Sequence, residues 1–276
     1  MAAAVRQAVV AQTTDDMMAG GPVREFIMLA GKDSTGKTCA VLSLAMYIQM
    51  TQPEAKFYII DTENKVKGAL RSFGADAPAN IVYYKVGNMN EVTEVIAKVI
   101  EQHSPGDWLA TESLARVWER AQDLGYQAIE GVSKVEFLER KRLDKNIKSP
   151  IPRPDDFWAV VKGAHDGAFF DLLTQMDDLN CVFTTTIAKA KPDYGNRKEN
   201  ADRKALRIEL GIDSNLEGAP RLPYYVETLC LLDLVAGNVT CRVLRDNLST
   251  AESSRLEFEV PDKKSWGLQF YANCRG

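Results

Sequence analysis

Eight consecutive residues, 31–38, have the types and spacing of a phosphate-binding loop. They match the pattern G-x-x-x-x-G-K-[ST] at every fixed position. Its two glycines permit backbone angles that turn successive N–H groups toward one point, where they can hold a phosphate. The lysine can reach the outer phosphates of a nucleoside triphosphate, and the threonine hydroxyl can bind Mg²⁺. The predicted nucleotide-binding residues are Gly31, Lys32, Asp33, Ser34, Thr35, Gly36, Lys37, Thr38 and Cys39.

The alternative is a glycine-rich turn in which Lys and Thr follow by chance. The flanking sequence favours phosphate binding, because a short apolar strand precedes the loop and a strongly apolar helix follows it. The guanine-reading pattern N/T-K-x-D does not occur in the chain. We therefore expect ATP as the nucleotide and Mg²⁺ as its metal.

Acidic residues follow two other apolar runs. One run leads into Asp61-Thr62-Glu63 and the other into Glu112-Ser113. Ligands of parallel α/β sheets lie at the carboxyl ends of the strands, so both acidic ends are expected near the phosphate loop. A P-loop site needs an acid to hold magnesium and a polar group to orient the attacking water. Asp61 by itself can equally be a helix cap.

These motifs require a sheet that brings strand ends together. Apolar runs predict strands over residues 25–30, 56–60, 81–86 and 107–111, with helices over residues 37–50, 65–73, 91–102 and 113–129 between and after them. Strands that alternate with helices at short spacing indicate a parallel sheet covered on both faces.

The second half of the chain is less regular. We expect a helix over residues 155–178, a strand over 180–187, two strands over 224–234 and 239–244, and a weaker pair of strands over 256–260 and 266–271. Residues 132–154 and 189–223 are expected to be exposed basic loops. The domain then covers residues 23–276, preceded by an N-terminal arm or frayed helix over residues 1–22.

Composition restricts the remaining classes. The 276 residues carry a net charge of −4, so nucleic-acid binding would need a local basic patch. The five cysteines lack C-x-x-C spacing, which favours a reducing compartment and argues against structural zinc. Because no apolar run approaches the roughly 20 residues of a membrane span, we expect a cytoplasmic protein without a membrane partner.

The order of these motifs resembles the RecA-like P-loop ATPases. In that family a P-loop is followed by a strand ending in D-x-E, a strand ending in Asp-Ser, and a strand ending in a phosphate-sensing polar residue. This chain has residues 31–38, then 61–63, then 112–113, then Thr184-Thr185-Thr186. More narrowly, the chain looks like phage-type ATPases of recombination or single-strand annealing, through Asp107-Trp108, Arg116-Val117-Trp118 and Phe157-Trp158.

The resemblance covers roughly residues 24–250 and implies a fold, namely a mainly parallel twisted sheet with helices on both faces and antiparallel strands toward the C-terminus. It also implies roles. Glu63 corresponds to the catalytic glutamate, and Glu112 corresponds to the magnesium-holding acid, where the family has Asp. Thr186 stands where RecA has a γ-phosphate-sensing glutamine. Arg245 resembles a cation that reaches the neighbouring subunit's ATP, although a surface arginine on an edge strand is an equal alternative.

Two basic segments fall where the family binds DNA. The candidate DNA-binding residues are Lys189, Lys191, Arg197, Lys198, Arg203 and Lys204, and a second basic stretch spans residues 141–148. Acidic residues interleave with both, so solvated surface loops are an alternative. The resemblance implies a Mg²⁺-dependent ATPase of DNA recombination or annealing that forms a ring or filament of identical subunits, in the host cytoplasm if viral. A nucleotide-dependent switch with slow hydrolysis and no DNA role is the alternative, and a small-molecule kinase is the least favoured.

Overall fold

The computed structural model of the chain describes residues 24–189, 201–220, 222–248, 256–262 and 264–275. The predicted arm over residues 1–22 lies outside this part of the chain. So do three of the candidate DNA-binding residues, Lys191, Arg197 and Lys198.

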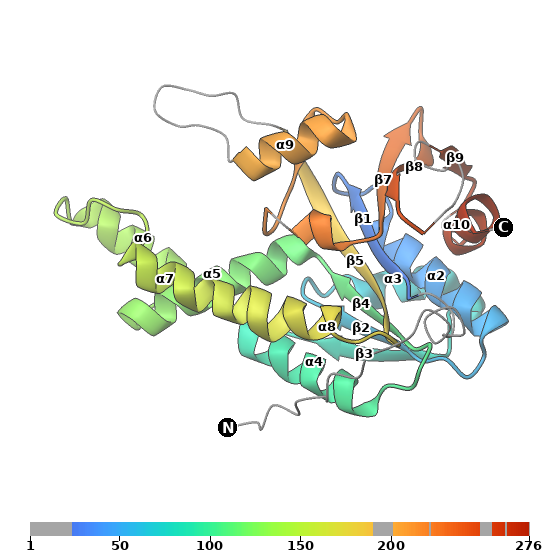
Figure 1. Ribbon diagram of the computed structural model, residues 1–276, viewed down its shortest axis with the longest axis horizontal. Coiled ribbons are helices and arrows are strands. Elements are labelled where there is room, and N and C mark those ends of the chain that lie inside the picture. The colour runs from blue at the N-terminus through green and yellow to red at the C-terminus, as the bar shows by residue number, and fades with distance from the viewer. Residues whose placement is uncertain (1–23, 190–200, 221, 249–255, 263, 276) are drawn as a thin grey trace, which may run out of the picture.

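Within the described part of the chain, nine strands form a sheet in the order β3-β2-β4-β5-β1-β7-β8-β9, with β6 paired to β5 (Figure 1). The strands from β3 to β7 in this order run parallel, whereas β6, β8 and β9 are antiparallel to their neighbours. Their bounds are β1 (Phe26–Gly31), β2 (Phe57–Asp61), β3 (Ile81–Lys85), β4 (Trp108–Glu112), β5 (Asn180–Lys189), β6 (Ser214–Leu216), β7 (Thr228–Val235), β8 (Asn238–Asp246) and β9 (Glu257–Val260). The α/β fold predicted from the resemblance is confirmed.

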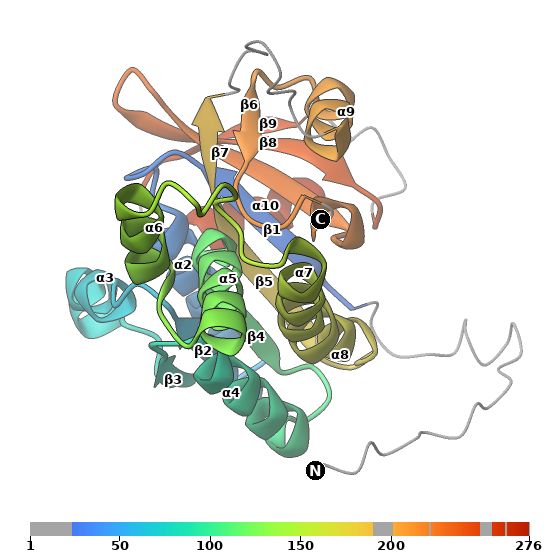
Figure 2. The same ribbon diagram turned by 90° about the vertical axis from the view of Figure 1, so that its left-hand side faces the viewer.

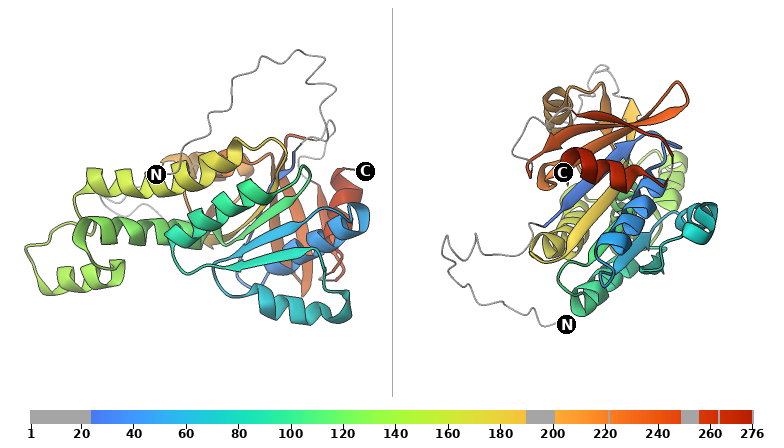
Figure 3. Two further views of the ribbon diagram at one scale, coloured as in Figure 1. Left: turned by 90° about the horizontal axis from the view of Figure 1, so that it is seen from below. Right: turned by 90° about the vertical axis from the view of Figure 1, so that its right-hand side faces the viewer.

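Helices cover both faces of this sheet (Figure 2). One face carries α2 (Lys37–Thr51), α3 (Val66–Phe73) and α10 (Trp266–Cys274); the other carries α4 (Met89–Gln102), α5 (Leu114–Glu130), α7 (Pro154–Lys162), a π-helix (Gly163–Asp171) and α8 (Leu172–Thr174). Strand β1 shows why the central strands are apolar throughout: Phe26 and Met28 enter one core, while Ile27 and Leu29 enter the other. Helix α6 (Lys134–Leu143) lies at the far end of α5 and α7, away from the sheet (Figure 3).

Three predictions about the elements are wrong. Residues 266–271 belong to helix α10 and not to a strand, because Trp266, Phe270 and Cys274 recur at helical spacing and pack on α2. The segment 132–154 is not simply a loop, since it contains α6. The segment 189–223 likewise contains helix α9 (Ala201–Leu210), β6 and a 3₁₀ turn (Leu222–Tyr225).

Strand register brings the sequence motifs to one edge of the sheet. Gly31 at the end of β1 pairs with Thr186 on β5, and Asp61 at the end of β2 pairs with Glu112 on β4. All four strands are parallel, so their carboxyl ends meet there. Strand β8 runs the other way, and Arg245 pairs with Leu229 toward the amino end of β7.

Candidate functional site

The phosphate loop joins β1 directly to α2 and has the backbone conformation its glycines permit. Gly36 has a φ of 85°, a left-handed conformation that most side chains avoid. Gly31 is closely packed, since a Cβ there would lie 2.5 Å from Thr35 Oγ1 and 2.6 Å from the Leu232 carbonyl oxygen. The ammonium of Lys37 donates to the carbonyls of Gly31 (2.8 Å) and Lys32 (2.7 Å), and its burial lowers its pKa. The lysine therefore lies across the mouth of the loop.

Glu112 is a buried acid at the end of β4. Its Oε2 accepts a hydrogen bond from Thr38 Oγ1 at 2.9 Å and lies 3.5 Å from Thr184 Oγ1, while its Oε1 is buried without a hydrogen-bond partner. Burial raises the pKa of this carboxyl to about 7, although the Thr38 hydrogen bond opposes the rise. The side chain is thus a buried acid with one oxygen available to a cation.

The donor set fits a hard divalent cation. Thr38 supplies a hydroxyl oxygen and Glu112 supplies the unpartnered carboxylate oxygen, and oxygen ligands are the ones that Mg²⁺ prefers. Over the described residues there is no group of three or more His, Cys, Asp or Glu side chains that could hold a metal by itself. In a P-loop site phosphates and waters complete the coordination, so two protein ligands are sufficient.

Glu63 lies at the rim of the same cleft. Its two carboxylate oxygens are each in an ion pair, Oε2 with Lys65 Nζ at 2.6 Å and Oε1 with Arg116 Nε at 3.2 Å. Burial alone would raise the pKa of Glu63, but the hydrogen bonds and charges of Lys65 and Arg116 outweigh it and lower the pKa. Glu63 is therefore an ionised carboxylate held by two cations.

Asp61, two residues earlier, has a structural role. Its carboxylate accepts backbone N–H groups from Glu63 (3.0 Å), Lys65 (3.3 Å) and Val66 (3.1 Å), and a hydrogen bond from the Tyr83 hydroxyl. It thereby satisfies N–H groups at the start of α3, as a helix cap does. This contact network also fixes the backbone that carries Glu63.

A cleft of about 340 Å³ is lined by most of the predicted residues, whereas Gly31, Lys32, Thr35 and Arg245 do not line it. Its lining includes Asp33, Ser34, Gly36, Lys37, Thr38, Cys39, Glu63, Glu112 and Thr186. Three residues near the cleft have a strained, left-handed backbone conformation: the φ values of Ser34, Asn64 and Ser113 are 65°, 60° and 64°. Each of them follows a strand that ends at this edge. Such strain concentrates at functional sites, where surrounding contacts hold it in place.

A smaller and more apolar hollow of about 180 Å³ adjoins the phosphate loop. It shares Gly36 and Cys39 with the cleft and is otherwise lined by residues of α2, β7, β8, β9, α10 and the connections between them, among them Ala40, Val239 and Trp266. Its walls offer flat apolar contact beside a phosphate-binding loop, and sequence reasoning did not find it.

Arg245 does not reach the cleft of its own chain. Its guanidinium donates to the carbonyls of Pro223 and Val226 and lies 3.6 Å from Glu209 Oε1. Burial lowers its pKa. The structure therefore ties this arginine to the segment between α9 and β7, at the opposite end of the strands from the phosphate loop.

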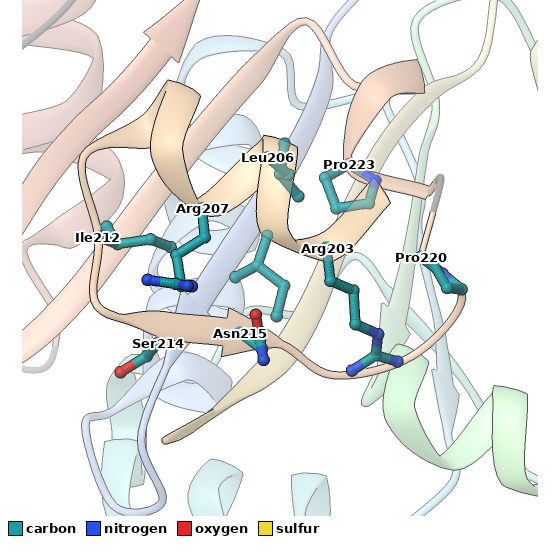
Figure 4. A pocket seen from close by; sticks show the side chains of 9 residues that line it. Arg203, Leu206, Arg207, Ile212, Ser214, Asn215, Pro220 and Pro223 are labelled. Carbon is teal, nitrogen blue, oxygen red and sulfur yellow. The ribbon is translucent and has the colours of Figure 1, made fainter. Parts of the chain in front are cut away.

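The described candidate DNA-binding residues have different surroundings. Arg203 and Arg207 lie on the side of α9 that faces β6, and Arg203 Nη2 donates to the Gly218 carbonyl at 2.6 Å (Figure 4). Lys204 is exposed on the outer side of α9. Lys189 ends β5, on the strand that carries Thr186. Arg203 is thus engaged in packing α9, while Lys204 is open to solvent.

Sequence reasoning missed the groups that hold the two acids. Lys65 and Arg116 pair with Glu63, and Thr184 contacts both Glu112 and the Ser113 backbone N–H. One signal was available for Arg116, since it lies one turn into the helix that follows the Glu112 strand. Its pairing with Glu63 depends on the adjacency of β2 and β4, which no local pattern reveals.

Comparison with known proteins finds similarity at the level of solved structures. No family model matches the chain, and no curated protein matches it. A KaiC-like protein of the hyperthermophilic archaeon Pyrococcus horikoshii is similar in structure, with 11% sequence identity over 90% of each chain and a TM-score of 0.49. At this level of identity the likeness carries neither an activity nor a partner over to this chain. Among the described residues, no helix is both long enough and apolar enough to cross a membrane.

Proposed function

We propose that this protein binds ATP with Mg²⁺ on residues 31–39 and hydrolyses it. The observation that carries the proposal is the 2.9 Å contact between Thr38 Oγ1 and Glu112 Oε2. It joins the hydroxyl of a phosphate loop to a buried acid 74 residues away, in a cleft that Lys37 and Glu63 also line. This combination of groups is the one that phosphoryl transfer to water requires.

Each residue has a distinct part in the proposal. Backbone N–H groups of the loop and the Lys37 ammonium hold the phosphates, and Thr38 with Glu112 holds Mg²⁺, which neutralises charge on them. Glu63 orients the attacking water and accepts its proton, and Thr186 donates a hydrogen bond to the terminal phosphate. The apolar hollow with Ala40, Val239 and Trp266 supports binding of the adenine base, because it continues from the loop.

The test is nucleotide binding and phosphate release by the full chain. Lys37→Ala should abolish both, whereas Lys98→Ala, which removes an exposed cation on α4, should leave both unchanged. Binding that survives in Lys37→Ala at the wild-type affinity would contradict the proposal. Binding without phosphate release would favour the alternative, a slow nucleotide-dependent switch.

We further propose that single-stranded DNA is a partner and that the activity serves recombination or annealing. Support comes from Lys189 at the end of β5, on the strand of Thr186, and from the exposed Lys204 on α9, which packs on the β6 strand paired with the end of β5. Phosphate release should be compared without DNA, with single-stranded and with double-stranded DNA. Single-stranded DNA should stimulate it, with an affinity that falls as salt rises. No stimulation and no retention at low salt would exclude this partner.

We also propose that the protein forms a homo-oligomer in which Arg245 reaches the ATP bound to a neighbouring subunit. In that case Arg245 must leave the carbonyls of Pro223 and Val226 when subunits assemble. Arg245→Ala should then lower phosphate release only under conditions in which the protein is assembled. A wild-type rate in the assembled variant would remove Arg245 from the mechanism.

A further inference from the structure

A second and larger cleft of about 680 Å³ lies beside the nucleotide cleft. It is formed by the connection after β2 and by helices α5 and α6, and its lining includes Arg116, Arg120, Asp123 and Lys134. The two clefts share Glu63 and Lys65. A ligand in this second cleft would therefore lie beside the carboxylate proposed to orient water.

Two cations of the second cleft have only neutral hydrogen-bond partners among the described residues, while the charges of Glu91, Glu119 and Asp123 act on Arg120 from further away. Arg120 Nη2 donates to the Thr62 carbonyl at 2.7 Å, and its Nε is buried without an acceptor. Lys134 Nζ donates to the Gln122 amide oxygen at 3.0 Å. The nearby acid Asp123 is already used, since it accepts the Lys134 backbone N–H at 2.8 Å at the start of α6. Four cations and three acids line the cleft, so its side chains carry a net charge of +1 (4 − 3).

The third cation, Arg116, connects this cleft to Glu63. Its Nε lies 3.2 Å from Glu63 Oε1, and its Nη1 lies 2.6 Å from Glu119 Oε2. More than half of its side chain is exposed, so the guanidinium can turn toward a new anion. While it is paired with Glu63, one carboxylate oxygen is held in an ion pair and is less basic.

We propose that the second cleft binds a phosphate-bearing anion through Arg120 and Lys134, and that the bound anion draws Arg116 away from Glu63. Guanidinium and ammonium groups are the side chains that bind phosphate most strongly. None of the described residues that line the cleft is aromatic, so it recognises phosphate and not a base. The phosphate belongs either to a free oligophosphate or to the backbone of single-stranded DNA. The effect on Glu63 rests on the proposed ATP hydrolysis, whereas the binding does not.

Binding is tested in a Lys37→Ala background, which removes the phosphate-loop ammonium. The probes are tripolyphosphate and a single-stranded oligodeoxynucleotide at low salt. Replacing Arg120 and Lys134 together with Gln should weaken binding at least about tenfold, because each charged hydrogen bond is a substantial part of such an affinity. The matched control replaces two exposed cations outside the cleft, Arg71 and Lys98, with Gln.

Each outcome decides the proposal. Loss of tripolyphosphate binding in the cleft variant but not in the control supports a free oligophosphate, and loss of oligonucleotide binding alone supports the DNA backbone. Equal affinities in the cleft variant and the control would overturn the proposal. The proposal would also be overturned if neither tripolyphosphate nor the oligonucleotide bound to the Lys37→Ala protein.

Release of Glu63 is tested by phosphate release from ATP. Arg116→Gln should raise the basal rate about tenfold, the value of one charged hydrogen bond, and the bound probe should then add nothing further. The link between the cleft and Glu63 would be overturned if Arg116→Gln released phosphate at the wild-type basal rate and the probe still stimulated it as in the wild type. If no variant and no wild-type protein releases phosphate, the proposed hydrolysis is wrong, while the binding measurements still decide whether the anion site exists.

Discussion

Charged side chains are paired differently at the two edges of the sheet, the edge where the parallel strands begin and the edge where they end. At the amino edge, Arg275 makes a bidentate ion pair with Glu25 (2.8 and 2.9 Å) and contacts Asp246 (2.6 Å) and the Thr228 hydroxyl. At the carboxyl edge, Glu112 is more deeply buried than Arg275 and Glu25 and has an oxygen without a hydrogen-bond partner.

The pKa values follow from this difference. Burial alone would lower the pKa of Arg275, but Glu25 and Asp246 outweigh it and raise the pKa. Burial raises the pKa of Glu112, and no cation in the chain compensates fully. The ion pairs of Arg275 with Glu25 and Asp246 tie the starts of β1 and β7, the end of β8 and the C-terminal helix together, although Glu227 at the same edge keeps an unpartnered oxygen. At the carboxyl edge, the unpartnered oxygen of Glu112 leaves room for a ligand's charge. We expect substitutions at the amino edge to change stability and substitutions at the carboxyl edge to change chemistry.

The largest effect is expected for Glu63→Gln. In the proposed mechanism Glu63 orients water and accepts its proton, so its loss should lower phosphate release by about 10² to 10⁴-fold. Nucleotide affinity and the unfolding midpoint should change little, because Glu63 lies at the rim and not in the core. The control Glu94→Gln removes an exposed acid from α4. A rate within about twofold of wild type would place the water-orienting group elsewhere.

Arg275→Ala should produce the converse result. Removing one partner of this buried network leaves Glu25 and Asp246 uncompensated, which costs about 4 kcal/mol of unfolding free energy. The phosphate-release rate per folded molecule should stay unchanged. Urea unfolding measures the first quantity, with the exposed Arg71→Ala as its control. If stability were kept and activity lost, the contrast between the two edges would be wrong.

Glu112 should make stability depend on pH in the absence of metal. The folded carboxyl has a pKa of about 7, above the ordinary value of 4.5, so the folded state keeps a proton that the unfolded state loses. Stability should therefore fall as pH rises from 4.5 to about 7, by up to about 3 kcal/mol, and then level off. Glu112→Gln should lack this decrease. Identical pH profiles for wild type and variant would mean that Glu112 is ionised in the folded protein.

The smallest effect is expected at Thr186, which lines the cleft and pairs with Gly31. Thr186→Val keeps the shape and removes one neutral hydrogen-bond donor, worth about 1 kcal/mol. Phosphate release should fall about fivefold with nucleotide affinity nearly unchanged. A loss comparable to that of Glu63→Gln would show that Thr186 has a larger part in the chemistry than a single hydrogen bond.

The sequence predicted most of the fold because the central strands and helices have clear apolar periods. It failed for residues 266–271, whose apolar residues were interpreted as a strand. These residues belong to helix α10, in which Trp266 and Phe270 are buried on one side. It also missed α6 and α9 within charged segments, because charge alone does not distinguish an exposed helix from a loop. It selected Glu63 and Glu112, which the structure places in one cleft, but not the cations around Glu63.

The sequence by itself determined the loop of residues 31–38 between β1 and α2, since eight adjacent residues specify its backbone and its side chains without help from distant parts. It also determined which acids follow the strands. Only the tertiary structure decided what those acids contact. Thr38 meets Glu112 across 74 residues and Arg116 meets Glu63 across 53, because strand order brings these ends to one edge. Strand order is a property of the whole sheet, and no local pattern encodes it.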